Sequence, residues 1–441
     1  MDYADTLIAA RWIVPIEPFG TVLEHHAVAI RDGRIVAVEP AKRALERFSA
    51  ARLISRPTHV LLPGFVNAHV HGAMTLLRGA AESGRFDHWL KTQVWPLEQR
   101  WLDAEYVRDG TELAIADMIT SGTTCFADMH LYPEVVAQTA ADAKIRACVA
   151  SPVVDFATAW ADSADECLDK GLKLHDEYRN DPLVSTMLAP YAPWAVSDTT
   201  LRRVQRLADE LESPVAMHLN QSPADNPAGA ERAIVRLERL GLLSPLLTAI
   251  HMTQATHDDL QRASRGGISI VHCPQSNLKL GNGIAPIATF REHGINVALG
   301  TGGAASNNDL SMLDELRTAA LIANGIANGV AQTDEAAITA HEWLQIATLD
   351  GARALCLADQ IGSLVPDKWA DLCCVDLNRP HTQPVYDPVA QLLYSVSRDQ
   401  VSDVWVAGRA LLENGTLTHL DIADVIRRAQ LWQTRISGSA A

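Results

Sequence analysis

Basic residues and long apolar runs are scarce in this chain of 441 residues. Lys and Arg number 37 against 53 Asp and Glu, which gives a formal net charge of −16. A nucleic-acid partner is not expected, because binding phosphates needs a basic surface. No apolar run reaches the roughly 20 residues that span a bilayer. The N-terminus, MDYADTLIAA, has no basic stretch followed by an apolar core. We therefore expect no membrane partner.

A cysteine framework is also lacking. The seven cysteines are an odd number, and no CxxC occurs. Disulfides are therefore not expected, and the chain fits a reducing cytoplasm better than an oxidising compartment. Apolar residues at 48% and charged residues at 20% are ordinary for a globular protein.

Two β-rich segments flank an alternating middle. Near the N-terminus, TLIAARWIV and HAVAIRDGRIVAVE read as strands, with a hairpin turn at Asp32-Gly33 because this pair readily takes up positive φ. Near the C-terminus, ADLCCVDL and VSDVWVAGRALLENG read the same way, with a turn at Asn414-Gly415. We expect these segments to pair into one small β domain, residues 1–60 with 362–430, beside a larger domain of residues 61–361.

The middle contains eight short apolar runs, most of them followed by a helical pattern such as TLRRVQRLADELES. The runs are VLLPGFVNAHVH, GTTCFADM, IRACVASP, VSTMLAPY, SPVAMHLN, LLTAIHMT, ISIVHCPQSN and INVALGTGG. Eight β/α units predict an α/β fold of the (β/α)8 barrel type. An open, doubly wound parallel sheet is the alternative.

Histidines stand at the ends of several of these runs. The first ends in His69-Val70-His71, the fifth carries His218 and the sixth His251. Catalytic groups of such barrels lie at the carboxyl ends of the strands. Side chains two apart on a strand point the same way, so both imidazoles of the HxH can reach one ion. The alternative is that His218 and His251 are hydrogen-bonded core residues. We expect His272 and His130 to be structural or to support the site from outside the ligand set.

These motifs occur in an order that resembles the amidohydrolase superfamily. The similarity covers nearly the whole chain and is carried by PGFVNAHVHGAMTLLRG, WL at Trp89, WPLE at Glu98, MHLN, HMTQ, HCPQSN, GTGGAASNN and the tail stretch IGSLVPDKWADL. Its nearest branch is identified as the 5-methylthioadenosine/S-adenosylhomocysteine deaminases, with chlorohydrolase-like relatives.

The resemblance implies a set of roles. One divalent ion, zinc in most of the family, would be held by His69, His71 and His218, and it would lower the pKa of a bound water. His251 would orient that water and act as a catalytic residue. Trp89 and Glu98 would line a nucleoside pocket, with Glu98 accepting hydrogen bonds from ribose hydroxyls. The resemblance also allows for a homodimer.

The chain departs from the family at two acids. Gln221 stands where the family has a proton-shuttling glutamate, and Gly302 stands where it has a metal-binding aspartate. Neither can carry a proton, and glycine offers no side-chain ligand. We expect Gln221 to bind the substrate. Asp309 is not expected to substitute for the missing aspartate. Tyr191 occupies a position where the nucleoside deaminases usually have histidine, and the segment after Gln221 is short.

Three functional hypotheses follow from these observations. The first is a metal-dependent hydrolase or deaminase of a purine nucleoside or a related N-heterocycle, acting on a carbon–nitrogen bond of a cyclic amidine in a small-molecule substrate. The second is a catalytically impaired or silent paralogue that binds a ligand or partner, because Gln221 and Gly302 replace both acids. The third is an active enzyme in which other groups move the protons.

Overall fold

Eight parallel strands form a barrel at the centre of the molecule. The computed structural model describes residues 1–81, 84–330 and 338–438. Neighbouring barrel strands pair in chain order. The strands are β5 (Phe65–Val70), β6 (Thr123–Met129), β7 (Arg146–Val153), β8 (Val184–Pro190), β9 (Val215–Leu219), β10 (Leu247–His251), β11 (Ser269–His272) and β12 (Asn296–Leu299). All eight apolar runs thus contain a barrel strand, which confirms the predicted fold and excludes the open doubly wound sheet.

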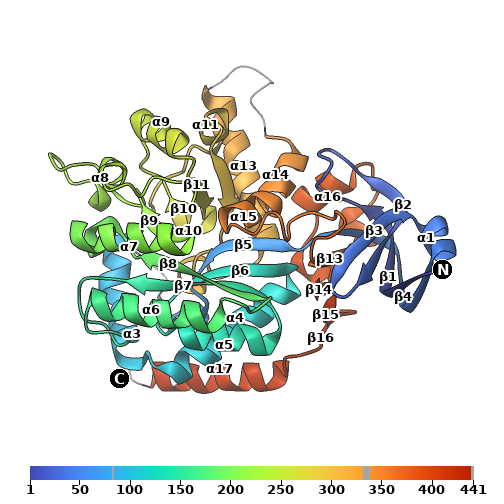
Figure 1. Ribbon diagram of the computed structural model, residues 1–441, viewed down its shortest axis with the longest axis horizontal. Coiled ribbons are helices and arrows are strands. Elements are labelled where there is room, and N and C mark those ends of the chain that lie inside the picture. Colours follow the sequence, from blue (N-terminus) through green and yellow to red (C-terminus); the bar gives the residue numbers. More distant parts are fainter. Residues whose placement is uncertain (82–83, 331–337, 439–441) are drawn as a thin grey trace.

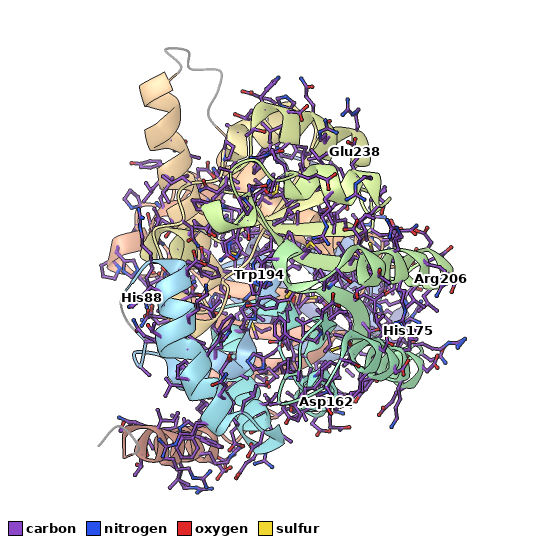
Figure 2. The ribbon with its side chains drawn as sticks, turned by 90° about the vertical axis from the view of Figure 1, so that its left-hand side faces the viewer. His88, Asp162, His175, Trp194, Arg206 and Glu238 are labelled. Carbon is purple, nitrogen blue, oxygen red and sulfur yellow. The ribbon has the colours of Figure 1, made fainter. Side chains whose placement is uncertain are left out.

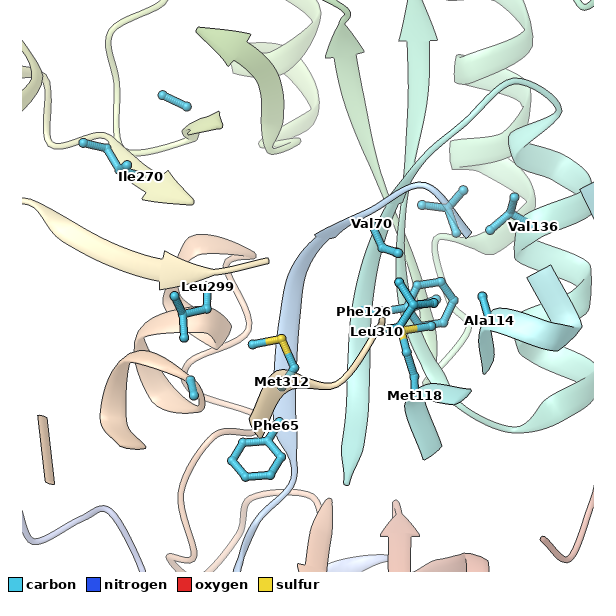
Figure 3. Packing of buried hydrophobic residues seen from close by; sticks show 14 of the residues in the cluster. Phe65, Val70, Ala114, Met118, Phe126, Val136, Ile270, Leu299, Leu310 and Met312 are labelled. Atoms are coloured by element: carbon cyan, nitrogen blue, oxygen red, sulfur yellow. The ribbon is translucent and has the colours of Figure 1, made fainter. Parts of the chain in front are cut away.

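The barrel strands are apolar because both of their faces are covered. Every residue of β5, β6 and β7 is buried. Figure 3 shows part of the surrounding core, in which Phe65 and Val70 of β5 lie near Phe126, Leu310 and Met312. Parallel strands with helices outside and packed side chains inside need such continuous apolar runs.

Glycines allow the barrel to close between its first and last strands. Gly302, just after β12, forms a parallel bridge with Val70, and its N–H donates to the carbonyl of His69 over 3.0 Å. A Cβ on Gly300 would lie 2.8 Å from the Cβ of His69. Because no side chain fits at that distance, the glycine lets the chain approach the histidine strand directly.

A second sheet combines the two ends of the chain, as the sequence predicts. Its order is β16-β15-β14-β13-β4-β1-β2-β3, and the two halves meet where β13 pairs antiparallel with β4. The predicted turns at Asp32-Gly33 and Asn414-Gly415 both have positive φ at each residue, which suits tight hairpins. The strands are β1 (Asp2–Ile13), β2 (Leu23–Arg31), β3 (Arg34–Pro40), β4 (Phe48–Pro63), β13 (Leu372–Asp376), β14 (Val401–Val406), β15 (Arg409–Glu413) and β16 (Thr416–Leu417).

Helices surround the barrel, and the last one returns to it from the second sheet. Figure 1 shows α17 (Ile422–Ser437) running beneath the barrel, where it packs on α4 (Ala104–Thr120). Within the described residues, no helix combines the length and apolar character needed to cross a membrane. The others are α1 (Ala41–Arg47), α2 (Phe86–Trp89), α3 (Trp95–Trp101), α5 (Pro133–Ala143), α6 (Ala164–Tyr178), α7 (Asp198–Leu211), α8 (Ala233–Arg239), α9 (His257–Gly266), α10 (Pro274–Lys279), α11 (Ile287–Glu292), α12 (Ala304–Asn307), α13 (Met312–Val330), α14 (Ala340–Ile346), α15 (Leu349–Ala354) and α16 (Pro388–Tyr394).

Candidate metal centre and substrate cavity

Three imidazoles converge at the carboxyl ends of β5 and β9. His69 and His71 come from the HxH of the first run, and His218 comes from the fifth. One ligand nitrogen from each lies within 4.8 Å of the other two. The Nε2 atoms of His69 and His218 are 3.3 Å apart. Strand alternation and barrel topology therefore bring together the residues that the sequence predicts as ligands.

Backbone carbonyls orient two of these rings. Nδ1 of His71 donates to the carbonyl of Met129 over 2.6 Å, and Nδ1 of His218 donates to the carbonyl of Tyr191 over 2.8 Å. A carbonyl can only accept, so the proton of each ring is on Nδ1 and the lone pair is on Nε2. Such hydrogen bonds fix the tautomer and the direction of a metal ligand.

The protonation of the three rings also suits a cation. Burial lowers the pKa of all three, helped by the neighbouring imidazoles, and it brings the pKa of His71 to about 3. The rings are therefore neutral at physiological pH, which is the form that binds metal. Three neutral nitrogen donors at this spacing fit a divalent ion such as zinc, which accepts three-histidine sites with a further position open. The cluster is a site for one divalent metal ion.

His251 lies against this cluster at the end of β10. Its ring centroid is 5.6 Å from that of His218 and 6.1 Å from that of His69. Nδ1 is hydrogen-bonded to Oδ1 of Asn277 over 2.8 Å, which leaves Nε2 to face another group. His251 has a φ of 80°, a backbone conformation that is energetically unfavourable for a non-glycine residue. Residues in such conformations cluster at functional sites.

His272, on the neighbouring strand β11, lies outside the three-histidine cluster. Its Nδ1 is buried and has no hydrogen-bond partner within the part of the chain that the structure describes. Burial, with His251 nearby, lowers the pKa of His272 to about 3. Its expected structural role stays a prediction.

The two positions that lack acids both lie at this site. Gln221 is buried just beyond β9, where its N–H donates to Asp225 over 2.6 Å and its carbonyl accepts from Thr253 over 2.8 Å. Gly302 is hydrogen-bonded to the backbone of the ligand His69 and has a φ of 64°. Asp309 lies between α12 and α13 and pairs with Arg398 at 2.7 Å. Among the described residues, no carboxylate joins the histidine cluster.

A cavity of about 640 Å³ opens from the histidine cluster, with His71 in its wall. Its walls come from α3 and from the segments that follow β6, β7 and β8. Figure 2 views the molecule from the left-hand side of Figure 1 and shows Trp194 near the centre, with the helical segment that carries His88 to its left. The lining residues are His71, Met74, Trp95, Glu98, Gln99, Leu102, Met129, His130, Leu131, Pro152, Val154, Phe156, Ala157, Thr158, Ala159, Tyr191 and Trp194.

Glu98 and Trp95 line the cavity, whereas Trp89 does not. Glu98 lies in the cavity wall, as the sequence leads us to expect. Trp89 is buried outside the wall, with Nε1 donating to the carbonyl of Ala81 over 2.9 Å. Trp95, six residues later, lines the cavity, and its ring lies 6.4 Å from that of Trp194. Trp95 is the first residue of the WPLE motif, from which only Glu98 was selected as a pocket residue, because the face that a helix turns to a cavity depends on packing.

Two further wall residues were not selected from the sequence as ligand contacts. Nε2 of His130 is 3.2 Å from Oε1 of Glu98, and the side chains of both are largely buried. Burial opposes charge on His130, but Glu98 raises the pKa of the imidazole above its ordinary value. The Tyr191 ring is 4.8 Å from that of His218. Both residues follow barrel strands, the one signal that could have identified them.

Comparison with known proteins gives the family. The model of the amidohydrolase family matches residues 60–411. A 5-methylthioadenosine/S-adenosylhomocysteine deaminase of Teredinibacter turnerae is 43% identical over 436 residues, covering 98% of each chain. The corresponding protein of Saccharophagus degradans is 40% identical, with 99% of this chain and 98% of the relative covered.

Solved structures agree with this assignment. An adenosine deaminase from Xanthomonas campestris with bound zinc is 44% identical and superposes with a TM-score of 0.96, covering 99% of both chains. Atrazine chlorohydrolase from Arthrobacter aurescens, complexed with zinc, shares the fold at a TM-score of 0.89 and 23% identity, over 97% of this chain and 99% of that one. The chain belongs to the amidohydrolase family.

Proposed function

We propose that this protein is a zinc-dependent deaminase of adenine nucleosides that carry a 5′-thioether, such as 5-methylthioadenosine or S-adenosylhomocysteine. The observation that carries the proposal is His71, which belongs both to the metal cluster and to the cavity wall. A ligand in the cavity would therefore meet the ion directly. The relatives named for these two nucleosides, at 43% and 40% identity over nearly the full chain, support this substrate class.

The bound ion would supply a water made more acidic by the metal, which is the nucleophile needed for hydrolytic deamination. His251 would hold that water through Nε2, because Asn277 fixes the opposite side of its ring. Gln221 would donate a hydrogen bond to a ring nitrogen of the purine. Holding the reacting groups in this geometry lowers the barrier even before any proton is transferred.

The cavity wall would bind the nucleoside. The aromatic faces of Trp95 and Trp194 suit stacking against a purine, and Glu98 would accept hydrogen bonds from ribose hydroxyls. His130 holds the Glu98 carboxylate in place from the side. Trp89 would then support the wall from behind rather than touch the ligand. A homodimer and a cytoplasmic location stay predictions from the sequence.

The comparisons lend no support to a catalytically silent paralogue. The relatives are named as enzymes, and the described chain retains the histidine cluster, His251 and an open cavity. What distinguishes this chain is the absence of carboxyl groups at 221 and 302. We expect that difference to affect the rate of proton transfer rather than the class of reaction.

Ammonia release from 5-methylthioadenosine by the zinc-loaded protein tests the proposal. Release should be measurable, should stop after chelation and should return when zinc is added. His69→Ala should lose both bound zinc and activity, because two imidazoles bind the ion less tightly than three. Zinc should also raise Tm in wild type but not in His69→Ala, since a ligand that binds only the folded state stabilises it.

His419→Ala is the matched control, because His419 is exposed and lies far along the chain from the cluster. It should retain zinc and activity. Stoichiometric zinc in His69→Ala would contradict the ligand assignment. An absence of ammonia release from either nucleoside with zinc bound would contradict the proposed activity.

A further inference from the structure

The cavity has a buried inner end and an exposed outer end. Met129 and His130, beside the metal cluster, are only 2% and 5% exposed. Phe156 and Trp194, also in the wall, are each 46% exposed. If the purine reacts at the histidine end and the ribose meets Glu98, the 5′ substituent of the nucleoside points to the outer end. This orientation rests on the proposed function.

The outer wall is apolar and carries no basic side chain among the described lining residues. Its apolar lining residues include Leu102, Leu131, Phe156, Ala157 and Ala159. The only ionisable lining groups in this part of the chain are His71, the Glu98–His130 pair and Tyr191. His130 is already hydrogen-bonded to Glu98, so it offers little to a second anion.

Two cations close to the wall in sequence make contacts elsewhere. Arg100, on the same helix as Glu98, places its guanidinium carbon 5.2 Å from the ring centre of Trp101. Lys170 pairs with Glu166 at 2.9 Å and also bonds to the carbonyl of Trp160. Acidic groups, by contrast, are near. Glu98 lies in the wall itself, and Asp225 accepts from the N–H of Gln221 over 2.6 Å.

We infer that the outer part of this cavity selects purine nucleosides whose 5′ substituent is uncharged and apolar, and that it discriminates against a substituent carrying a carboxylate. An alkylthio group gains contact with the apolar wall, because burying apolar surface is favourable. An amino-acid tail brings a carboxylate that must lose part of its hydration without a cationic partner. The two nucleosides named for the relatives differ in this tail, and the wall favours the methylthio compound.

Equilibrium binding of three 6-oxo nucleosides to the zinc-loaded full chain tests the inference, because their purine ring has no 6-amino group to lose. Inosine has no tail, 5′-butylthioinosine has an apolar tail, and S-inosylhomocysteine has a tail of similar length with both charges. Calorimetry should give a Kd for the butylthio compound that is at least tenfold lower than for the homocysteine compound.

Two variants of Gln99 test whether a positive charge in the wall changes the binding of the charged tail. Gln99 is an exposed wall residue on α3. Gln99→Arg should strengthen binding of S-inosylhomocysteine several-fold relative to binding of the butylthio compound. Gln99→Met, of similar length but uncharged, should not strengthen binding of the homocysteine compound.

The outcomes separate this inference from the proposed function. Equal affinity for the two thioethers, or tighter binding of the homocysteine compound, would overturn the inference while leaving a nucleoside site in place. Equal effects of Gln99→Arg and Gln99→Met on S-inosylhomocysteine would also overturn it. Failure of all three nucleosides to bind would contradict the proposed function itself.

Discussion

Position 302 combines a missing acid with an unusual backbone. Gly302 has a φ of 64°, where an L-residue costs roughly 1–2 kcal/mol. A Cβ there would lie 3.3 Å from Oγ of Ser306 and 3.6 Å from Ser276. An aspartate is therefore sterically possible with small adjustments, and Asp is among the residues that tolerate this conformation best. The space around position 302 therefore does not require a glycine there.

Restoring both acids should increase the rate of deamination. Gln221→Glu adds a group that can give a proton to the purine, and Gly302→Asp adds one that can take a proton from water. A general acid or base typically contributes about 10²–10⁴-fold. The double variant should gain far more in kcat than either single variant, because the two groups act on successive proton transfers of one reaction. Ammonia release from all four proteins, each loaded with zinc, measures this.

Gln430→Glu, at an exposed position of helix α17, controls for the added charge and should leave kcat unchanged. If wild type already turns over as fast as the double variant, the proton transfers use other groups. An unchanged double variant would show that the acids are not what limits this site.

Asp128 gives a pH dependence at the residue scale. It is buried, its Oδ2 accepts from the N–H of Gly72 over 2.6 Å, and its Oδ1 has no partner. Burial raises its pKa to about 6, against the opposing effects of His130 and the Gly72 N–H. The folded state therefore keeps a proton that the unfolded state loses near pH 4. Stability falls as pH rises from about 4 to about 6, by about 3 kcal/mol at most.

Asp128→Asn should flatten this dependence, because the amide does not titrate. The measurement is Tm against pH for metal-free wild type and variant, with exposed Asp359→Asn as control. The Tm of Asp128→Asn relative to wild type should rise between pH 4 and 6 and stay constant above that range. A constant difference across the range would show that Asp128 titrates alike in both states.

At the scale of elements, the eight strands could be predicted because a strand covered on both faces needs an apolar run, and that requirement is local. The ends of the runs placed His69, His71 and His218 together for the same reason. The cavity wall could not be predicted in the same detail. Whether Trp89 or Trp95 faces the cavity depends on how the α2–α3 segment packs, and that packing is set by distant residues.

A buried tryptophan helps to hold the last helix against the barrel. Trp432 of α17 is 3% exposed, packs edge-on to Tyr106 at 5.3 Å, and donates from Nε1 to Asp109 over 2.9 Å. Trp432→Ala should lower the free energy of unfolding by about 3–5 kcal/mol, because it leaves a cavity. Trp432→Phe, which keeps most of the packing, should cost less.

Denaturant midpoints of the Trp432 variants measure the effect, with Arg427→Ala as control. Arg427 pairs with Asp424 on the exposed side of the same helix, and such surface pairs contribute about 0–1 kcal/mol. Equal losses in Trp432→Ala and Arg427→Ala would mean that α17 is not held by its buried face.

At the scale of the whole molecule, the barrel and the N-terminal half of the terminal sheet are joined by a single residue. Only Gly64 separates β4 from β5, and a Cβ there would lie 2.0 Å from the side chain of Thr124. The Gly64 N–H donates to the carbonyl of Asp371 over 3.0 Å. The strand that carries two metal ligands therefore begins at a junction with the other sheet.

A buried ion pair spans the same junction. Arg146 at the start of β7 binds Asp371 at 2.7 Å, and their side chains are 3% and 2% exposed. Asp371 also accepts from the N–H of Ala407 over 2.7 Å. Asp371→Leu should lower the free energy of unfolding by about 3–5 kcal/mol, because it leaves the guanidinium buried and unpaired.

Arg146→Leu combined with Asp371→Leu should recover part of that loss, since no charge then stays buried without a partner. Glu413→Ala is the control, because it breaks the exposed pair with Arg52 and should cost about 1 kcal/mol or less. Chemical denaturation of wild type, Arg146→Leu, Asp371→Leu and the double variant gives the coupling between the two residues. The zinc affinity of each, measured alongside, should fall in Asp371→Leu if the junction holds β5 in position. Additive losses in the double variant would contradict the pairing, and unchanged zinc affinity would separate the junction from the metal site.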